Sequence, residues 1–169
     1  MRDFARERLV PFAAEWDRDA TFPRAARAEL GRMGLMGVCV PERWGGAGLD
    51  HVSLAVALEE VAAGDGACST VLSVQNSVVC GPLAAFGTDA QKARWLTPLA
   101  RGERLGCFCL TEPHVGSDAA AIRTRAERDG AHWVLNGVKQ FITTGRHADC
   151  AVVFAVTGKG AGKKGISAF

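Results

Sequence analysis

The spacing of hydrophobic residues changes once along the chain, near residue 103. Before that point apolar residues recur every three or four positions, which is typical of one face of an α-helix. After it they alternate with polar residues, which is typical of a half-buried strand. The pattern predicts an α+β fold, with an all-α helical domain over residues 1–103 followed by a mostly antiparallel β-barrel or sandwich domain over residues 104–169.

Helix-end signals support the helical part. Asp50 and Thr88 each stand where a side chain can cap the first turn of a helix, and Thr21 precedes a proline in a similar way. Gly34 and Gly102 follow the last periodic residue, where glycine often ends a helix. The chain is expected to kink at Gly81-Pro82, and the predicted helices cover residues 3–19, 23–33, 51–63, 67–80, 83–86 and 89–101.

The second part contains short alternating segments separated by turn residues. The dipeptides Asp129-Gly130 and Asn136-Gly137 are each flanked by such segments, and both are typical of two-residue hairpin turns. Two hairpins in succession favour antiparallel neighbours. The predicted strands cover residues 105–110, 122–128, 131–135, 138–143, 150–156 and 166–169.

Composition narrows the class of protein. Hydrophobic residues make up 48% and charged residues 22%, which favours a folded core. The net charge of +2 gives no argument for a nucleic-acid surface, and no apolar run approaches the roughly 20 residues of a membrane span. The six cysteines form neither a disulfide framework nor a CxxC metal pair, so we expect reduced, buried structural thiols, a reducing compartment and no metal.

Two glycine-rich stretches resemble phosphate-binding loops without meeting their requirements. Residues 41–48 lack the lysine and hydroxyl of a P-loop. Residues 160–165 satisfy G-x-G-x-x-G, but β-like residues 166–169 follow where a dinucleotide site needs a helix. Both stretches are therefore predicted to be connections.

Polar residues crowd together where the strand 105–110 ends. Thr111 and Ser117 supply hydroxyls there, and the stretch from 111 to 118 also holds two carboxylates and two breaker residues. Such groups at the end of a buried strand can surround a bound small molecule. A second segment, residues 141–143, places an aromatic ring and a threonine at the end of another predicted strand. An ordinary polar turn is the alternative on local pattern alone.

The exact strings carry more information than the pattern. LTEPHVGSD, preceded by GCF and followed by LNGVKQFITTG, resembles the flavin-binding signature of the acyl-CoA dehydrogenase family. PERWGGAGLD, FGTDAQKARWLTPLARGE and ADCAVVFAVT are similar to further landmarks of that family, in the same order. The resemblance covers essentially the whole chain.

The resemblance implies FAD as cofactor. It places Thr111 near the pyrimidine end of the flavin, Thr143 toward the hydride-accepting nitrogen, and Ser117 along the acyl-CoA channel as a substrate contact. Phe141 occupies a position where many members have tryptophan. Phenylalanine would still place an apolar ring against the flavin. The implied cofactor contacts are Phe108, Cys109, Leu110, Thr111, Gly116, Ser117, Phe141, Ile142 and Thr143.

The implied reaction is the α,β-dehydrogenation of a short- or branched-chain acyl-CoA to the trans-2-enoyl-CoA. Family members use a glutamate base from a later helical domain, and neither Glu112 nor Asp118 matches it, so no catalytic residue is expected in this chain. The 169 residues alone are expected to be inactive. The resemblance further implies electron-transfer flavoprotein as acceptor and a homodimer or homotetramer. The high content of alanine, arginine and glycine, with no targeting segment in these residues, predicts a bacterial cytoplasmic protein, and a mitochondrial matrix protein without its presequence is the alternative.

Two alternative functions are also compatible with the sequence. An acyl-CoA oxidase or a flavin-dependent monooxygenase would share the scaffold, because a fold does not fix a function. A non-catalytic remnant that keeps only the shape is a third reading.

Overall fold

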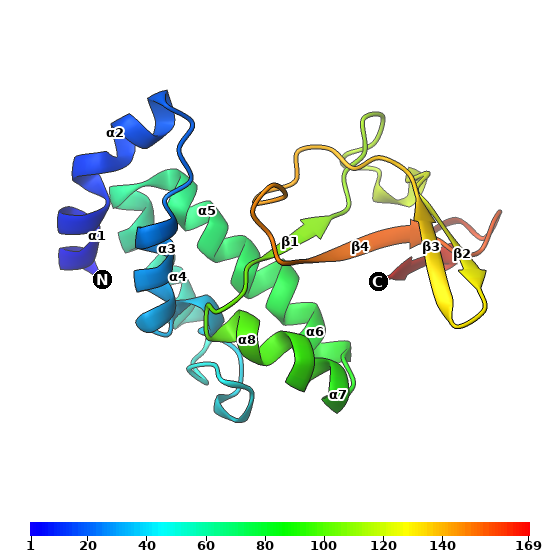
Figure 1. Cartoon of the computed structure of the whole chain (residues 1–169), viewed down its shortest axis with the longest axis horizontal. Coiled ribbons are helices and arrows are strands. Elements are labelled where there is room, and N and C mark those ends of the chain that lie inside the picture. The colour runs from blue at the N-terminus through cyan, green and yellow to red at the C-terminus, as the bar shows by residue number, and fades with distance from the viewer. The chain divides into compact units, whose positions relative to one another are not determined.

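The computed structural model describes residues 1–169, which divide into two compact units, Met1–Leu105 and Gly106–Phe169. The first unit is helical and the second carries a sheet, as the hydrophobic spacing predicts (Figure 1). No helix combines the length and the apolar character needed to cross a bilayer. The helices are α1 (Arg2–Arg8), α2 (Val10–Arg18), α3 (Arg24–Arg32), α4 (His51–Gly64), α5 (Gly66–Val74), α6 (Gly81–Phe86), α7 (Asp89–Gln91) and α8 (Thr97–Ala100).

The predicted helix caps are confirmed at two of three positions. The Asp50 carboxylate accepts the Ser53 N–H at 2.8 Å, and the Thr88 hydroxyl accepts the Gln91 N–H at 3.2 Å. The predicted cap at Thr21 is wrong, because α3 begins at Arg24 with no side-chain cap. The single helix predicted over residues 3–19 is divided at Leu9 into α1 and α2, where the following proline has no N–H to continue the hydrogen bonding.

Two prolines lie inside helical runs, and each follows a π-helical segment. Residues Gln75–Cys80 precede Pro82, and residues Lys92–Leu96 precede Pro98. In a regular α-helix a proline ring presses on the carbonyl one turn earlier and leaves it unpaired. The wider π turn relieves that conflict. The helical run continues through Gly81-Pro82, the site of the predicted kink, because Gly81 keeps helical dihedral angles.

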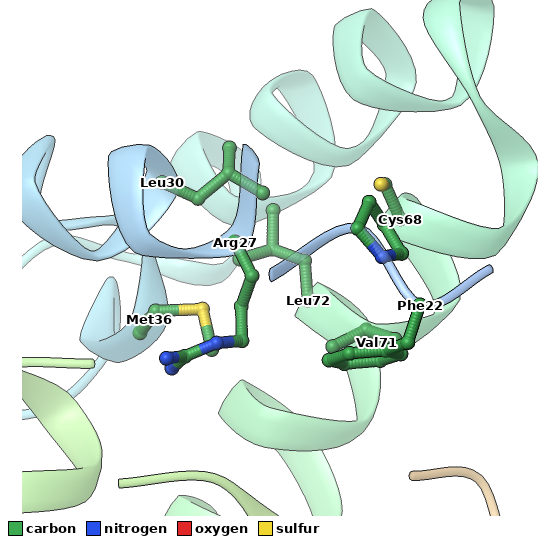
Figure 2. A pocket seen from close by; sticks show the side chains of 8 residues that line it. Phe22, Arg27, Leu30, Met36, Cys68, Val71 and Leu72 are labelled. Atoms are coloured by element: carbon green, nitrogen blue, oxygen red, sulfur yellow. The ribbon is translucent and has the colours of Figure 1, made fainter. Parts of the chain in front are cut away.

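The core of the first unit is an apolar cluster shared by several helices. Leu9, Leu30, Met36 and Leu72 are all at most 2% exposed. Figure 2 shows Leu30, Met36 and Leu72 gathered near Arg27, whose guanidinium donates to the Gly102 carbonyl at 2.9 Å. A cationic side chain therefore joins the helical core to the end of the unit.

The loop that precedes α4 is folded back on itself. The Ala47 N–H donates to the Gly37 carbonyl and the Gly48 N–H to the Val40 carbonyl, both at 2.9 Å. Asn76 braces the loop from a helix, because its Oδ1 accepts the Val38 N–H at 2.7 Å. The glycine-rich stretch 41–48 thus serves as a packed connection, as its sequence predicts.

The second unit is a mixed sheet with β4 as its central strand (Figure 1). β4 runs parallel to β1 from Cys150 to Val153, parallel to β2 at Val156, and antiparallel to β5. The prediction of a mostly antiparallel sheet is wrong, and no strand pairing closes a barrel. The strands are β1 (Gly106–Cys109), β2 (Arg125–Asp129), β3 (His132–Asn136), β4 (Cys150–Val156) and β5 (Ile166–Ala168).

Only one of the two predicted hairpins forms. Gly130 has φ +57° and joins the antiparallel pair β2 and β3, so that prediction is confirmed. The Asn136-Gly137 hairpin is wrong, because residues 138–143 form no strand. Gly137 instead packs on Thr124, whose Oγ1 would lie 2.3 Å from an added Cβ. Close packing against Thr124, rather than a tight turn, explains the glycine.

All six cysteines are free thiols, as predicted, but Cys39, Cys109 and Cys150 are only partly buried. Burial raises the pKa of Cys68 to about 12, and burial together with the neighbouring Cys109 thiol raises the pKa of Cys107 to about 12. These two thiols are therefore uncharged at neutral pH and behave as small apolar side chains.

Candidate functional site

The structure brings the two polar segments of the second unit together. The Gln140 N–H donates to the Thr111 carbonyl at 2.9 Å. Lys139 Nζ donates to the Leu110 carbonyl at 3.0 Å, and the Thr144 hydroxyl donates to the Gly106 carbonyl at 2.9 Å. Residues 139–144 are thus fastened alongside β1 and the start of the loop that follows it.

The second segment has a strained backbone. Phe141 has φ +57° and Thr144 has φ +63°, in a region that bulky and β-branched residues rarely adopt. Such conformations cost about 1–3 kcal/mol each and persist only where the surroundings enforce them. Phe141 is also 84% exposed, so its aromatic ring faces outward.

Several hydroxyls of the two polar segments have no hydrogen-bond partner within the chain. The side-chain hydroxyls of Thr111, Ser117 and Thr143 make no hydrogen bond to another residue. The backbone here is turned tightly, since the Gly145 N–H donates to the Ile142 carbonyl at 3.0 Å. These hydroxyls are therefore available to a ligand.

The other predicted site residues have mixed surroundings. The Phe108 ring packs edge-on against Phe154 with ring centres 5.2 Å apart, which fixes it within the sheet. Cys109 Sγ lies 3.6 Å from Cys107 Sγ. Gly116 and Ser117 lie on the exposed part of the loop after β1. The structure therefore places Thr111 beside the segment that contains residues 141–143, and Phe108 is a packing residue of the sheet.

Glu112 is the feature that sequence reasoning missed. Its side chain is almost fully buried, and its carboxylate accepts the Arg123 N–H at 2.6 Å and the Thr124 N–H at 2.9 Å. Lys139 Nζ donates to the same carboxylate at 2.9 Å, and His114 Nε2 lies 3.6 Å away. One signal was visible in the sequence, because Lys139 is the only Lys, Arg, Asp or Glu between Asp129 and Arg146.

The environment keeps Glu112 ionised. Burial pushes the pKa of this carboxyl upward, but hydrogen bonds to Lys139 and to the backbone of residues 123 and 124 outweigh it and lower the pKa from 4.5 to about 2. A carboxylate with that pKa and with donors on both oxygens is a poor proton acceptor near neutral pH. Glu112 is thus a structural anion.

Acid is expected to weaken the sheet unit through Glu112. Its folded pKa is lowered, so its contribution is present above the unfolded value of 4.5 and is lost as pH falls toward 2. The shift corresponds to roughly 3 kcal/mol, most of it lost between about pH 5 and pH 2. Urea unfolding followed by fluorescence of Trp133, the only tryptophan of this unit, measures the loss. The Glu112→Gln variant should show a flatter pH dependence, and equal slopes would contradict the assignment.

Comparison with known proteins identifies the family. The model of the acyl-CoA dehydrogenase N-terminal domain matches residues 1–103, and that of the acyl-CoA dehydrogenase middle domain matches residues 107–169. The chain belongs to the acyl-CoA dehydrogenase family. Enzymes named acyl-CoA dehydrogenases are FAD-dependent oxidoreductases.

Individual relatives support the assignment to this family. The human short-chain specific acyl-CoA dehydrogenase, mitochondrial, is 46% identical over 168 residues, which cover 99% of this chain and 41% of that protein. A chain from a structure of the electron transferring flavoprotein of Acidaminococcus fermentans is 42% identical with a TM-score of 0.96, over 99% of this chain and 44% of that one. A glutaryl-CoA dehydrogenase from Mycobacterium smegmatis, in complex with FADH2, is 42% identical with a TM-score of 0.87, over 92% of this chain and 40% of that one.

The chain spans less than half the length of the curated relatives that it matches, between 41% and 45% of those named first. Its residues nonetheless fit a flavin. A flavin site needs hydrogen-bonding groups for the polar edge of the ring and an apolar group for its face. The available hydroxyls of Thr111 and Thr143 and the outward ring of Phe141 supply both.

Proposed function

We propose that this chain forms the flavin-contacting part of an FAD-dependent acyl-CoA dehydrogenase that converts a short- or branched-chain acyl-CoA to its trans-2-enoyl-CoA. The observation that carries the proposal is the hydrogen bond from the Gln140 N–H to the Thr111 carbonyl. It fastens the two candidate segments side by side. The name of the human relative, short-chain specific, supports the substrate class.

Each proposed contact has a chemical task. Thr111 and Thr143 offer hydroxyls to the polar edge of the flavin, and Phe141 offers its face. Residues 108–110 and Ile142 supply backbone and apolar surface, while Gly116 and Ser117 border the acyl-CoA channel. FAD, when bound, supplies the two-electron acceptor. The two domains are proposed as residues 1–103 and 104–169, supported by the two family models and the two compact units.

The base for α-proton removal is proposed to lie outside these residues. Glu112 is the buried carboxylate beside the proposed site, and its oxygens are already occupied by donors. We therefore expect the 169 residues alone to bind FAD weakly and to show no turnover. Electron-transfer flavoprotein is the proposed acceptor, which the similarity to a chain of the Acidaminococcus fermentans structure supports. A homo-oligomer is supported by the exposure of β3. Its consecutive residues Trp133 and Val134 point to opposite faces of the sheet and are both exposed, which leaves apolar surface that a second subunit can cover.

Anaerobic reduction of bound flavin tests the proposal. The protein is expressed from its natural reading frame, and butyryl-CoA, isovaleryl-CoA and palmitoyl-CoA are added in turn. The first two should bleach the flavin absorbance and yield the corresponding 2-enoyl-CoA with an artificial electron acceptor. Thr111→Val should weaken FAD binding about tenfold, the effect of one lost hydrogen bond.

Controls separate the outcomes. Thr70→Val on α5 lies in the helical unit, where its hydroxyl bonds only the Gly66 carbonyl, so FAD affinity should not change. Rapid formation of hydrogen peroxide with oxygen would instead indicate an oxidase. A protein that binds no FAD under any condition would reject the proposal.

A further inference from the structure

One carboxylate and one ammonium link three separate stretches of the second unit. Glu112 accepts from the backbone of residues 123 and 124, and Lys139 Nζ reaches both Glu112 and the Leu110 carbonyl. The Lys139 side chain is 10% exposed and the Glu112 side chain 2%. These contacts form a largely buried junction between the three stretches.

The junction lies next to the residues that the flavin would touch. Thr111 precedes Glu112 in the chain, and Phe141 follows Lys139 by two residues. The positive φ of Phe141 has to be enforced by its neighbours, and the Lys139 and Gln140 bonds are the restraints immediately before it.

We propose that Glu112 and Lys139 are positioning residues that hold Thr111 and Phe141 in the arrangement that binds the flavin ring. The inference rests on the proposed function and deepens it. Neither residue touches the reacting atoms, and both act through their neighbours. His114, 3.6 Å from Glu112 and partly exposed, is the other titratable group that faces the carboxylate.

A purely stabilising role is a weaker explanation of the pair. A buried ion pair often contributes little net stability compared with apolar side chains of similar size. Its directional hydrogen bonds do fix geometry, because a misplaced charge in a dry site loses its partners. Replacing both side chains by apolar ones should therefore impair flavin binding more than it impairs folding, whereas replacing Lys139 alone also leaves the buried Glu112 carboxylate without its cation and lowers stability.

The test measures FAD affinity and hydrogen exchange in the protein expressed from its natural reading frame. Glu112→Gln and Lys139→Met should each weaken FAD binding by about 10- to 100-fold, through loss of charge-assisted hydrogen bonds. Lys139→Arg keeps a cation with several donors and should stay within about threefold of wild type. Amides of residues 110–118 and 139–145 should exchange faster in the impaired variants without FAD, while the helical unit keeps its protection.

Matched controls and a double variant sharpen the outcome. Glu127→Gln and Lys159→Met change exposed charges of the same unit and should leave FAD affinity unchanged. The double variant Glu112→Gln/Lys139→Met should bind FAD as tightly as whichever single variant has the lower FAD affinity, because the two side chains act as a pair. Wild-type affinity and exchange in Glu112→Gln, or Lys139→Arg as weak as Lys139→Met, would overturn the inference. Wild-type protein without FAD binding would reject the proposed function itself, and the inference with it.

Discussion

Gly46→Ala is expected to lower the free energy of unfolding of the helical unit by about 4 kcal/mol or more, among the largest effects of a single methyl group. The added Cβ would lie 2.1 Å from the Val40 carbonyl oxygen and 2.6 Å from the Gly37 carbonyl oxygen. Both oxygens are backbone atoms that already accept hydrogen bonds within the loop, from Gly48 and Ala47. No side-chain rotation can relieve the overlap, so the loop has to open.

The measurement is urea unfolding followed by helical circular dichroism. Gly66→Ala is the matched control, because nothing lies within 4 Å of the Cβ that it adds at the start of α5. That variant should be neutral or slightly stabilising, since alanine restricts the unfolded chain. Equal unfolding midpoints for the two variants would show that the loop tolerates the methyl group.

Asn76→Leu is expected to lower the same free energy by about 3–5 kcal/mol, because it leaves several buried polar groups without partners. Asn76 is 4% exposed. Its Oδ1 accepts the Val38 N–H at 2.7 Å, and its Nδ2 donates to the Leu35 and Leu72 carbonyls at 2.8 and 3.0 Å. Leucine fills a similar volume and can satisfy none of these groups.

The neighbouring Ser77 provides the control for Asn76. Its hydroxyl is exposed and donates only to the Ser73 carbonyl, one turn earlier in the same helix. Ser77→Ala should change the free energy of unfolding by no more than about 0.5 kcal/mol. An Asn76→Leu variant as stable as Ser77→Ala would mean that water or a shifted loop replaces the amide.

Features fixed by a few consecutive residues were predictable from the sequence. The caps at Asp50 and Thr88 and the turn at Gly130 depend on residues within one turn of each other, and all three are confirmed. The π turns were not predictable from periodicity, because they arise where a proline meets helical neighbours that packing holds in place.

Long-range pairing escaped the local pattern. Alternation predicts that β1 and β4 are strands, but it carries no information on which strands pair or in which direction. The left-handed backbone at Phe141 likewise contradicts the strand that its alternating neighbours suggest. The closeness of Thr111 to residues 141–143 was implied by family resemblance alone, and the Glu112–Lys139 junction joins positions too far apart in sequence for any short motif to reveal.

The parallel pairing of β1 with β4 bears on how the second unit folds. Gly106 pairs with Cys150, so the ribosome has to synthesise every residue between them before β1 and β4 can pair. Closing so long a loop costs conformational entropy before any stabilising contact forms, which slows folding. The β2–β3 hairpin needs only its own turn and can form early. During that interval the unpaired edge of β1 is open to wrong partners, which makes the order of events during synthesis as important as the final stability.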